Sequence, residues 1–448
     1  MLSPFLILAI GMAVVIGGIL ALRLHAFLAL ILGALTVAAL TPSDEAAISR
    51  VSTALGGGFS NLAIIIAMAA IIGKCLLDSG AAERIVMSLR NAFGEKRTPA
   101  ALAASAFTLG IPVFFDTVFY LLIPLGKALR MQTGKNYVLY ILAIVCGATM
   151  AHSLVPPTPG PLLVATELGV DIGVMMIGGL AVGLITVTAG YAYAVWANRR
   201  WEIPLRPSAE LSDEDLAAMV ERDPSELPRL TLAILPILLP VLLIGGQTVL
   251  KSLGHEYAVL NVLGDKNIAL ILSAGVALAM LAMAKGRSLD ELTTSVQSAL
   301  SSGGVILLIT SAGSAFGKML YATGISDSVA HLVPANQSLL LIPIAFFVTA
   351  AVRTAQGSAT VAMITAIGIV APIIGAVDLA FHPVYIALAV GCGSKPIMWA
   401  NDSGFWIIGR MSGMTPMETF RTASLQMIVM AITGLVVVML GASLLPLK

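Results

Sequence analysis

The chain has 448 residues, of which 58% are hydrophobic and 11% are charged, and its mean hydropathy is +0.97. A soluble domain is less apolar and carries about twice this share of charged residues, so the composition excludes that class and predicts an all-α polytopic membrane protein. The net charge of +1 excludes a large basic surface for nucleic acid, and no spacing of Cys and His predicts a metal site.

Apolar segments give the expected membrane helices in chain order. About 20 apolar residues cross a bilayer. Unbroken segments near this length occur at residues 4–22, 26–40, 59–77 and 172–197. Residues 98–130 are also apolar but are interrupted at Gly110 and Pro112, and each arm is about half a bilayer long. This pattern predicts a re-entrant hairpin rather than two crossings.

Two further apolar segments are broken where a spanning helix should continue. Residues 147–162 contain four prolines, and residues 391–404 contain several polar side chains. Proline removes a backbone donor and prevents a continuous helix, so each segment is expected to form a broken helix. The restarting arm of each would present exposed amides and a positive dipole end, which favours an anion.

One segment is clearly soluble. Residues 198–229 hold eight of the 24 acidic residues of the chain, and we interpret them as a cytoplasmic linker between two halves. Most Lys and Arg residues then lie on the same side of the membrane as this linker, in agreement with the positive-inside rule. Both chain termini are expected on the opposite, periplasmic side.

The second half of the chain repeats the first with a constant offset. Gly73 matches Gly317, and Gly147 matches Gly391, each pair being 244 positions apart. Internal repeats of this length are typical of transporters. Each half then has five membrane crossings, one re-entrant hairpin and one broken helix. Because five is an odd number, the two repeats are expected to be inverted relative to each other.

Ionisable residues at membrane depth point to one central site. A charged side chain near the bilayer centre costs about 2.5–3.5 kcal/mol on insertion scales, so it usually faces a partner or a water-filled cavity. Five such residues fall at or near the hairpins and broken helices: Asp116, His152, Arg353, Lys395 and Asp402. This clustering is not expected of scattered packing residues.

Each charged residue has an expected role. Arg353, at the tip of the second hairpin, is expected to bind a substrate carboxylate, because a guanidinium can bind one bidentately. Lys395 would do the same or would neutralise Asp402. Asp402 would either cap the restarting helix or carry a coupling proton. Asp116 lies among phenylalanines and is the preferred coupling-proton site, because desolvation favours the neutral carboxyl.

Uncharged polar residues complete the expected site. His152 either packs in the core or joins the binding site beside the prolines. Neutral donors and acceptors suited to the hydroxyls of a substrate are expected at Gln356, Ser358, Thr360, Thr158, Asn401 and Ser403.

Four motifs carry a family resemblance. They are GIPVFFDTVFYLLIPL at 110–125, HSLVPPTPGP at 152–161, RTAQGSATVA at 353–362 and NDSGFW at 401–406. On these motifs the chain resembles the gluconate permease (GntP) family of proton symporters, within the ion transporter superfamily. The resemblance implies a homodimeric elevator-type carrier of the bacterial inner membrane that moves sugar acids such as D-gluconate inward with protons. Thr158 and Gln356 depart from the family pattern, in which His and an apolar residue are expected.

An elevator divides each repeat into scaffold and transport parts. The first repeat, residues 1–197, is expected to have scaffold helices at 1–58 and 172–197 and transport elements at about 59–171. The second repeat, residues 230–448, is expected to have scaffold helices at 230–300 and 418–448 and transport elements at about 303–417.

Other functions remain open at this point. Within the carrier class, these are another small hydroxy acid or D-serine as the substrate, and sodium as the coupling ion. A channel would need a continuous polar path, whereas the polar residues here form one central layer. An intramembrane hydrolase would need a nucleophile signature, and Ser153 beside His152 matches neither HExxH nor GxSxG. The sequence therefore predicts a secondary transporter, with no enzymatic activity and no cofactor beyond the coupling ion.

Overall fold

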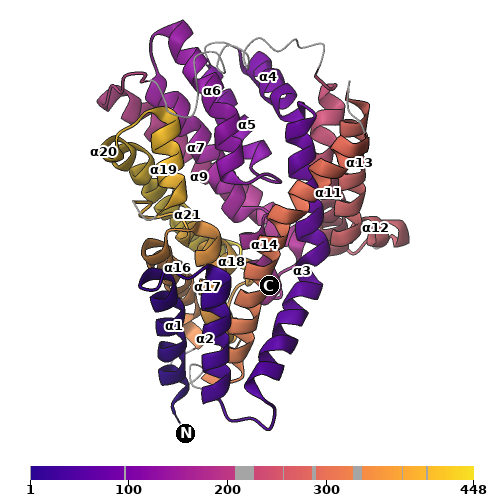
Figure 1. The fold of residues 1–448 in the computed structure, drawn as a ribbon, viewed down its shortest axis with the longest axis vertical. Coiled ribbons are helices and arrows are strands. Elements are labelled where there is room, and N and C mark those ends of the chain that lie inside the picture. The colour runs from indigo at the N-terminus through magenta and orange to yellow at the C-terminus, as the bar shows by residue number, and fades with distance from the viewer. Residues whose placement is uncertain are drawn as a thin grey trace.

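The computed structural model describes residues 2–94, 97–206, 227–255, 257–284, 289–325, 335–375, 377–399 and 402–447. All regular elements within these ranges are helical (Figure 1). Eight of the helical segments described are long and apolar enough to cross a membrane. The chain is thus an all-helical, multi-pass protein, as its composition predicts.

The helices of the first half are α1 (Pro4–Leu20), α2 (Ala26–Leu40), α3 (Ala47–Asp78), α4 (Ala81–Phe93), α5 (Thr98–Leu109), α6 (Phe115–Thr133), α7 (Tyr137–Leu154), α8 (Pro159–Glu167) and α9 (Ile172–Arg200). Those of the second half are α11 (Leu230–Ser252), α12 (Ala258–Leu263), α13 (Lys266–Met283), α14 (Leu289–Tyr321), η3 (Ala335–Leu340), α16 (Leu341–Gln356), α17 (Ala359–Ile374), α18 (Val384–Gly393), α19 (Ser403–Ser412), α20 (Pro416–Thr419), η4 (Phe420–Ser424) and α21 (Leu425–Leu444).

Helix α3 differs most from the sequence-based expectation, because it begins at Ala47 rather than near residue 59. Polar and small residues lower the hydropathy of its first turns, but the helix as a whole packs along α14. A Cβ at Gly58 would lie 3.0 Å from the Cβ of Ser314 and 3.1 Å from the Cα of Ser311, so glycine permits this close crossing. The expected scaffold boundaries at residues 58 and 300 both fall inside continuous helices, and the division into scaffold and transport parts stays a prediction.

Corresponding helices begin 244 positions apart at Phe115 and Ala359, at Pro159 and Ser403, and at Ile172 and Pro416. The offset read from the sequence therefore recurs in the helix boundaries. In Figure 1, α5 and α6 lie in the upper part of the view, and α16, α17 and α18 lie below them.

Local chemistry explains the two breaks. Helix α7 ends at Leu154 because Val155 precedes Pro156 and takes an extended conformation. Helix α8 then restarts with Pro159 at its first position, where proline is favoured. In the second half, the carboxylate of Asp402 caps α19 by accepting a hydrogen bond from the amide of Gly404 at 2.6 Å.

Each helical hairpin packs against elements of both halves. Helices α5 and α6 both contact α7, and α6 also contacts α19 of the second half. Helix α16 contacts α18, and its partner α17 contacts α8 of the first half. Every residue of α7 and α18 is buried, so these two helices form the centre of the molecule. The hairpin tips and the helix breaks are thereby brought together.

Most of the expected linker, residues 207–226, lies outside the described residues. Its flanks are held by two arginines. Arg206 pairs with both carboxylate oxygens of Glu418, at 2.6 and 2.8 Å. Arg84 donates to the carbonyl oxygen of Pro228 at 2.7 Å. These contacts fix the two ends of the linker to α20 and α4.

Candidate functional site

A cavity of about 390 Å³ lies where the hairpin tips and helix breaks meet. Small-molecule sites in proteins commonly have volumes of about 300–1,000 Å³. The residues around it come from the tip of α5–α6, the end of α7, the start of α8, the tip of α16–α17, the break between α18 and α19, the middle of α14 and the first turn of α21. Segments far apart in the sequence thus contribute to one pocket.

Four helices begin at this cavity. The lining includes Phe115 at the start of α6, Pro159 at the start of α8, Ala359 at the start of α17 and Ser403 at the start of α19. The first amides of a helix have no partner within the helix, and its N-terminus carries about half a positive charge. Four such ends around one pocket favour an anionic ligand.

Arg353 is buried and already engaged. Its Nε donates to the carbonyl oxygen of Ser394 at 2.9 Å, and its Nη2 forms an ion pair with the carboxylate of Asp402. Both side chains are 6% exposed. The Nη1 atom of Arg353 is buried and has no hydrogen-bond partner among the described residues. Asp402 therefore does two things at once, because it caps α19 and pairs with the guanidinium.

Lys395 is the second buried cation of the cavity. The residue is 4% exposed and lines the pocket two positions after the end of α18. Within the described part of the chain, its ammonium forms no hydrogen bond and has no carboxylate within 4.0 Å. Of the two roles considered for Lys395, the pairing with Asp402 is made by Arg353 instead.

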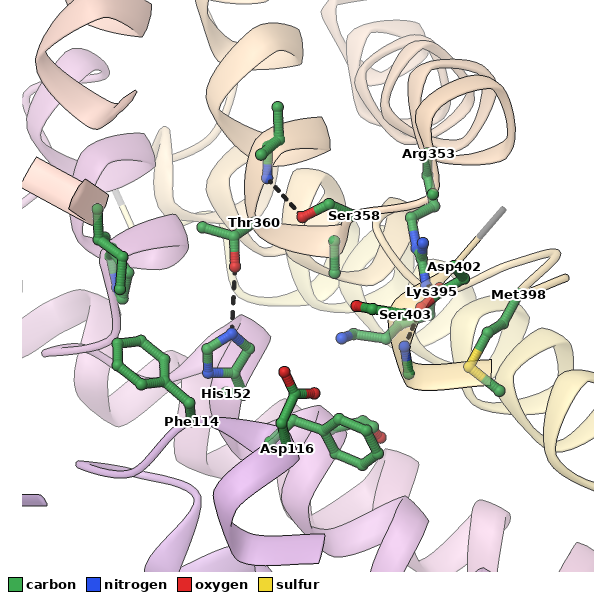
Figure 2. A pocket seen from close by; sticks show the side chains of 18 of the residues that line it. Phe114, Asp116, His152, Arg353, Ser358, Thr360, Lys395, Met398, Asp402 and Ser403 are labelled. Atoms are coloured by element: carbon green, nitrogen blue, oxygen red, sulfur yellow. Dashed lines mark hydrogen bonds and ion pairs between the residues drawn. The ribbon is translucent and has the colours of Figure 1, made fainter. Parts of the chain in front are cut away.

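His152 connects the two halves across the cavity. Its Nε2 lies 3.2 Å from the hydroxyl oxygen of Thr360, while Nδ1 is buried and has no hydrogen-bond partner in the part of the chain that the structure describes. The ring of Phe114 packs edge-on against the imidazole, with 5.8 Å between ring centroids. Figure 2 shows Phe114, Asp116 and His152 on one side of the cavity and Ser358 and Thr360 on the other.

Asp116 lies in the first turn of α6, and its carboxylate faces the cavity (Figure 2). The rings of Phe115 and Phe119 flank it in the sequence, with centroids 5.8 Å apart. No salt bridge joins Asp116 to a cation of the described residues. Its carboxylate therefore faces the cavity without a counter-charge from the described residues.

The structure brings together most of the residues chosen from the sequence. Those that line the cavity are Asp116, His152, Arg353, Ser358, Thr360, Lys395, Asp402 and Ser403. Thr158 and Gln356 do not line it. The Thr158 hydroxyl donates to the carbonyl of Val155 at 2.7 Å, and the Gln356 amide donates to the carbonyl of Ser358 at 3.1 Å. Asn401 lies outside the described residues.

Several residues that line the cavity were not predicted from the sequence. The additional lining residues include Thr117, Thr149, Ser302, Ile306, Ile309 and Met398. Thr149 lies one helical turn before His152, so helical spacing would have identified it. Ser302, Ile306 and Ile309 come from α14, which has no break and no charge at this depth. Within the described residues, no group of three His, Cys, Asp or Glu side chains could hold a metal ion.

Comparison with known proteins decides the family. The sequence model of the GntP family permeases matches residues 3–445. The chain belongs to this family. It is 33% identical over 425 residues to a gluconate permease of Pseudomonas aeruginosa, with 93% of each chain covered. It is 28% identical over 431 residues to the low-affinity gluconate transporter of Escherichia coli K12, with 94% of each chain covered.

A solved structure shares the fold. The chain superposes on the YdaH transporter of Alcanivorax borkumensis with a TM-score of 0.60, covering 94% of this chain and 98% of that one at 14% sequence identity. The sequence relatives of the chain described here are permeases and transporters rather than enzymes. The GntP family member described here is thus a multi-pass membrane transporter.

Proposed function

We propose that this protein is a secondary active transporter that takes up a sugar acid such as D-gluconate together with protons. The observation that carries the proposal is the single cavity onto which four helix N-termini and two buried cations converge. Relatives named gluconate permease or gluconate transporter support the choice of gluconate. Its carboxylate needs a positive potential, and its hydroxyl groups need neutral hydrogen-bonding partners.

The proposed binding residues fall into two groups. The cations of the site are Lys395 and Arg353, of which Arg353 is paired with Asp402, and the helix N-termini add to their positive potential. Neutral partners for the hydroxyls are proposed at Ser358, Thr360, Ser403 and His152, all of which line the cavity, and at Asn401. Thr158 and Gln356 are proposed to act one step away, by shaping the first break and the second hairpin tip.

Charge balance gives a physical reason for proton coupling. The four charged side chains of the cavity are Asp116, Arg353, Lys395 and Asp402, whose formal charges sum to zero. Protonation of Asp116 would leave one positive charge, which a monocarboxylate would neutralise. Binding of the anion and binding of the proton therefore favour each other, which is the requirement for symport. Asp402 is the weaker coupling site, because its carboxylate is already held by Arg353 and by the α19 amide.

The remaining parts of the proposal concern architecture. The 244-residue offset between helix starts supports two inverted repeats. The contacts between the hairpins and the broken helices of the two halves support an elevator, in which residues of about 59–171 and 303–417 move together as the transport domain. We further propose a homodimer in the bacterial cytoplasmic membrane, with the linker in the cytoplasm and both termini in the periplasm.

Uptake into proteoliposomes tests the function. Labelled gluconate is offered to vesicles containing the purified protein, with competition by aldonates, hexuronates, other hydroxy acids and D-serine. We expect saturable uptake that unlabelled gluconate suppresses, with chemically unchanged gluconate recovered inside. Stronger suppression by D-serine or a shorter hydroxy acid would reassign the substrate. Ohmic currents across a planar bilayer would contradict a carrier and favour a channel.

A further inference from the structure

Two buried cations line the same cavity, but their surroundings differ. Arg353 is paired with Asp402, whereas Lys395 is buried and has no acidic partner among the residues that the structure describes. A buried charge is costly unless it is paired, so the difference indicates which of the two needs a charged ligand. This step rests on the proposed function, because it assumes that the cavity binds a carboxylate.

The contacts of Arg353 are those of a positioning residue. It extends from the last turn of α16, and its Nε holds the carbonyl of Ser394 at the end of α18. Its Nη2 holds Asp402, which in turn caps α19 through the amide of Gly404. One guanidinium therefore connects the hairpin to both arms of the broken helix. Removing this connection would change the shape of the break.

Lys395, unlike Arg353, has no described partner that would hold its side chain in place. It directly follows Ser394 in the break and reaches the cavity where Ser403 and Gly404 begin α19 (Figure 2). Within the described residues its ammonium has neither a hydrogen-bond acceptor nor an acidic partner within 4.0 Å. A carboxylate placed beside it would receive a charge-assisted hydrogen bond and would also face the positive end of α19.

We infer that Lys395, rather than Arg353, forms the ion pair with the substrate carboxylate, and that Arg353 acts by holding the broken helix in shape. The site then offers one unpaired cation and, on the facing wall, the carboxylate of Asp116. A second carboxylate on the substrate would find no unpaired cation among the described lining residues, and it would leave the site with an uncompensated negative charge even when Asp116 is protonated. The preferred class is therefore a monocarboxylate polyol, and a sugar diacid of the same length is rejected.

The test compares three competitors of labelled gluconate uptake in proteoliposomes. They are unlabelled gluconate, the uncharged polyol glucitol, and the diacid glucarate. For the native chain we expect gluconate to compete best, and glucarate to compete at least tenfold less well. Absence of gluconate uptake by the native chain would refute the proposed function itself, whereas glucarate competing as well as gluconate would refute only the single-cation site.

Variants then separate the two cations. Lys395→Met removes the charge, and we expect a roughly 10- to 100-fold increase in the KM for gluconate with unchanged competition by glucitol. Lys395→Arg restores part of the preference for gluconate over glucitol. The double variant Arg353→Met with Asp402→Ala lowers the maximal rate but keeps that preference.

Two results would contradict the assignment of the substrate ion pair to Lys395. A Lys395→Met protein that still prefers gluconate over glucitol as the native chain does would overturn the inference. The same is true of a double variant that has lost the preference. Elution as a folded species in size-exclusion chromatography is the control for each variant, and Lys395→Gln supplies a second neutral side chain where Lys395→Met does not fold.

Discussion

The buried pair between Arg353 and Asp402 allows a sharp prediction about stability. Asp402→Ala removes two interactions together, the ion pair with the guanidinium and the cap of α19. Asp402→Asn removes the charge but keeps an oxygen that can accept from the Gly404 amide, because asparagine is also a good N-cap residue. The two variants therefore differ mainly by the cap.

The magnitudes follow from burial. Both side chains of the pair are 6% exposed, so Asp402→Ala leaves a guanidinium buried without its counter-charge. Breaking a buried pair in this way costs about 3–5 kcal/mol, and loss of an N-cap costs about 1 kcal/mol more. For a chain of 448 residues, the sum corresponds to a fall of roughly 4–6 °C in the apparent Tm. Asp402→Asn should fall slightly less.

Thermal unfolding of the detergent-purified protein measures the effect. The matched control is the double variant Arg353→Met with Asp402→Ala, which removes both charges and should recover most of the lost stability, because a buried pair replaced by apolar groups is often neutral. An Asp402→Ala protein with the native Tm would refute the reasoning. A double variant less stable than Asp402→Ala alone would also refute it.

Three further predictions concern the cavity and its support. Asp116→Asn should abolish accumulation of gluconate driven by a pH gradient but retain exchange of internal for external gluconate; accumulation at the native level would argue against Asp116 as the proton site. Gly147→Ala should lower the free energy of unfolding by about 1–3 kcal/mol, because its Cβ would overlap the carbonyl oxygen of Ala103 in α5. Gly126→Ala is the control: no atom lies nearer than 3.6 Å to its Cβ, so this variant should be as stable as the native chain or more stable. Equal Tm values for the two variants would contradict this packing. Thr360→Val should raise the KM for gluconate roughly tenfold, because it removes the hydroxyl that partners the His152 ring. Thr360→Ser keeps the hydroxyl and should have the native KM. Indistinguishable KM values for the two variants would show that this contact is unimportant.

Features of local chemistry were predictable from the sequence. The break after Leu154 follows from Pro156 and Pro157, and the second hairpin turns at Gly357, which adopts a φ of +84°. The expected helices at residues 4–22 and 172–197 are confirmed within a few residues. In each case one or two residues decide the backbone conformation, so no tertiary information is needed.

Features that depend on tertiary contacts were not predictable. Helix α3 starts earlier than its hydropathy suggests, because Gly58 lets it pack closely on α14. Helix α4 lies in a polar segment, so a search for apolar segments of membrane-spanning length does not find it. The sequence identifies both Arg353 and Lys395 as charged and deep, but only the fold reveals that Arg353 pairs with Asp402. Roles within a site depend on such pairings.

Gradient-driven accumulation tests the central claim most directly. Proteoliposomes containing the purified chain receive labelled gluconate under an imposed pH gradient, alkaline inside, with a sodium gradient and no gradient as parallel conditions. The account predicts that gluconate accumulates above its external concentration only under the pH gradient, and that a protonophore abolishes the accumulation. Uptake that merely equilibrates under all three conditions, or that accumulates only with sodium, would contradict proton-coupled transport.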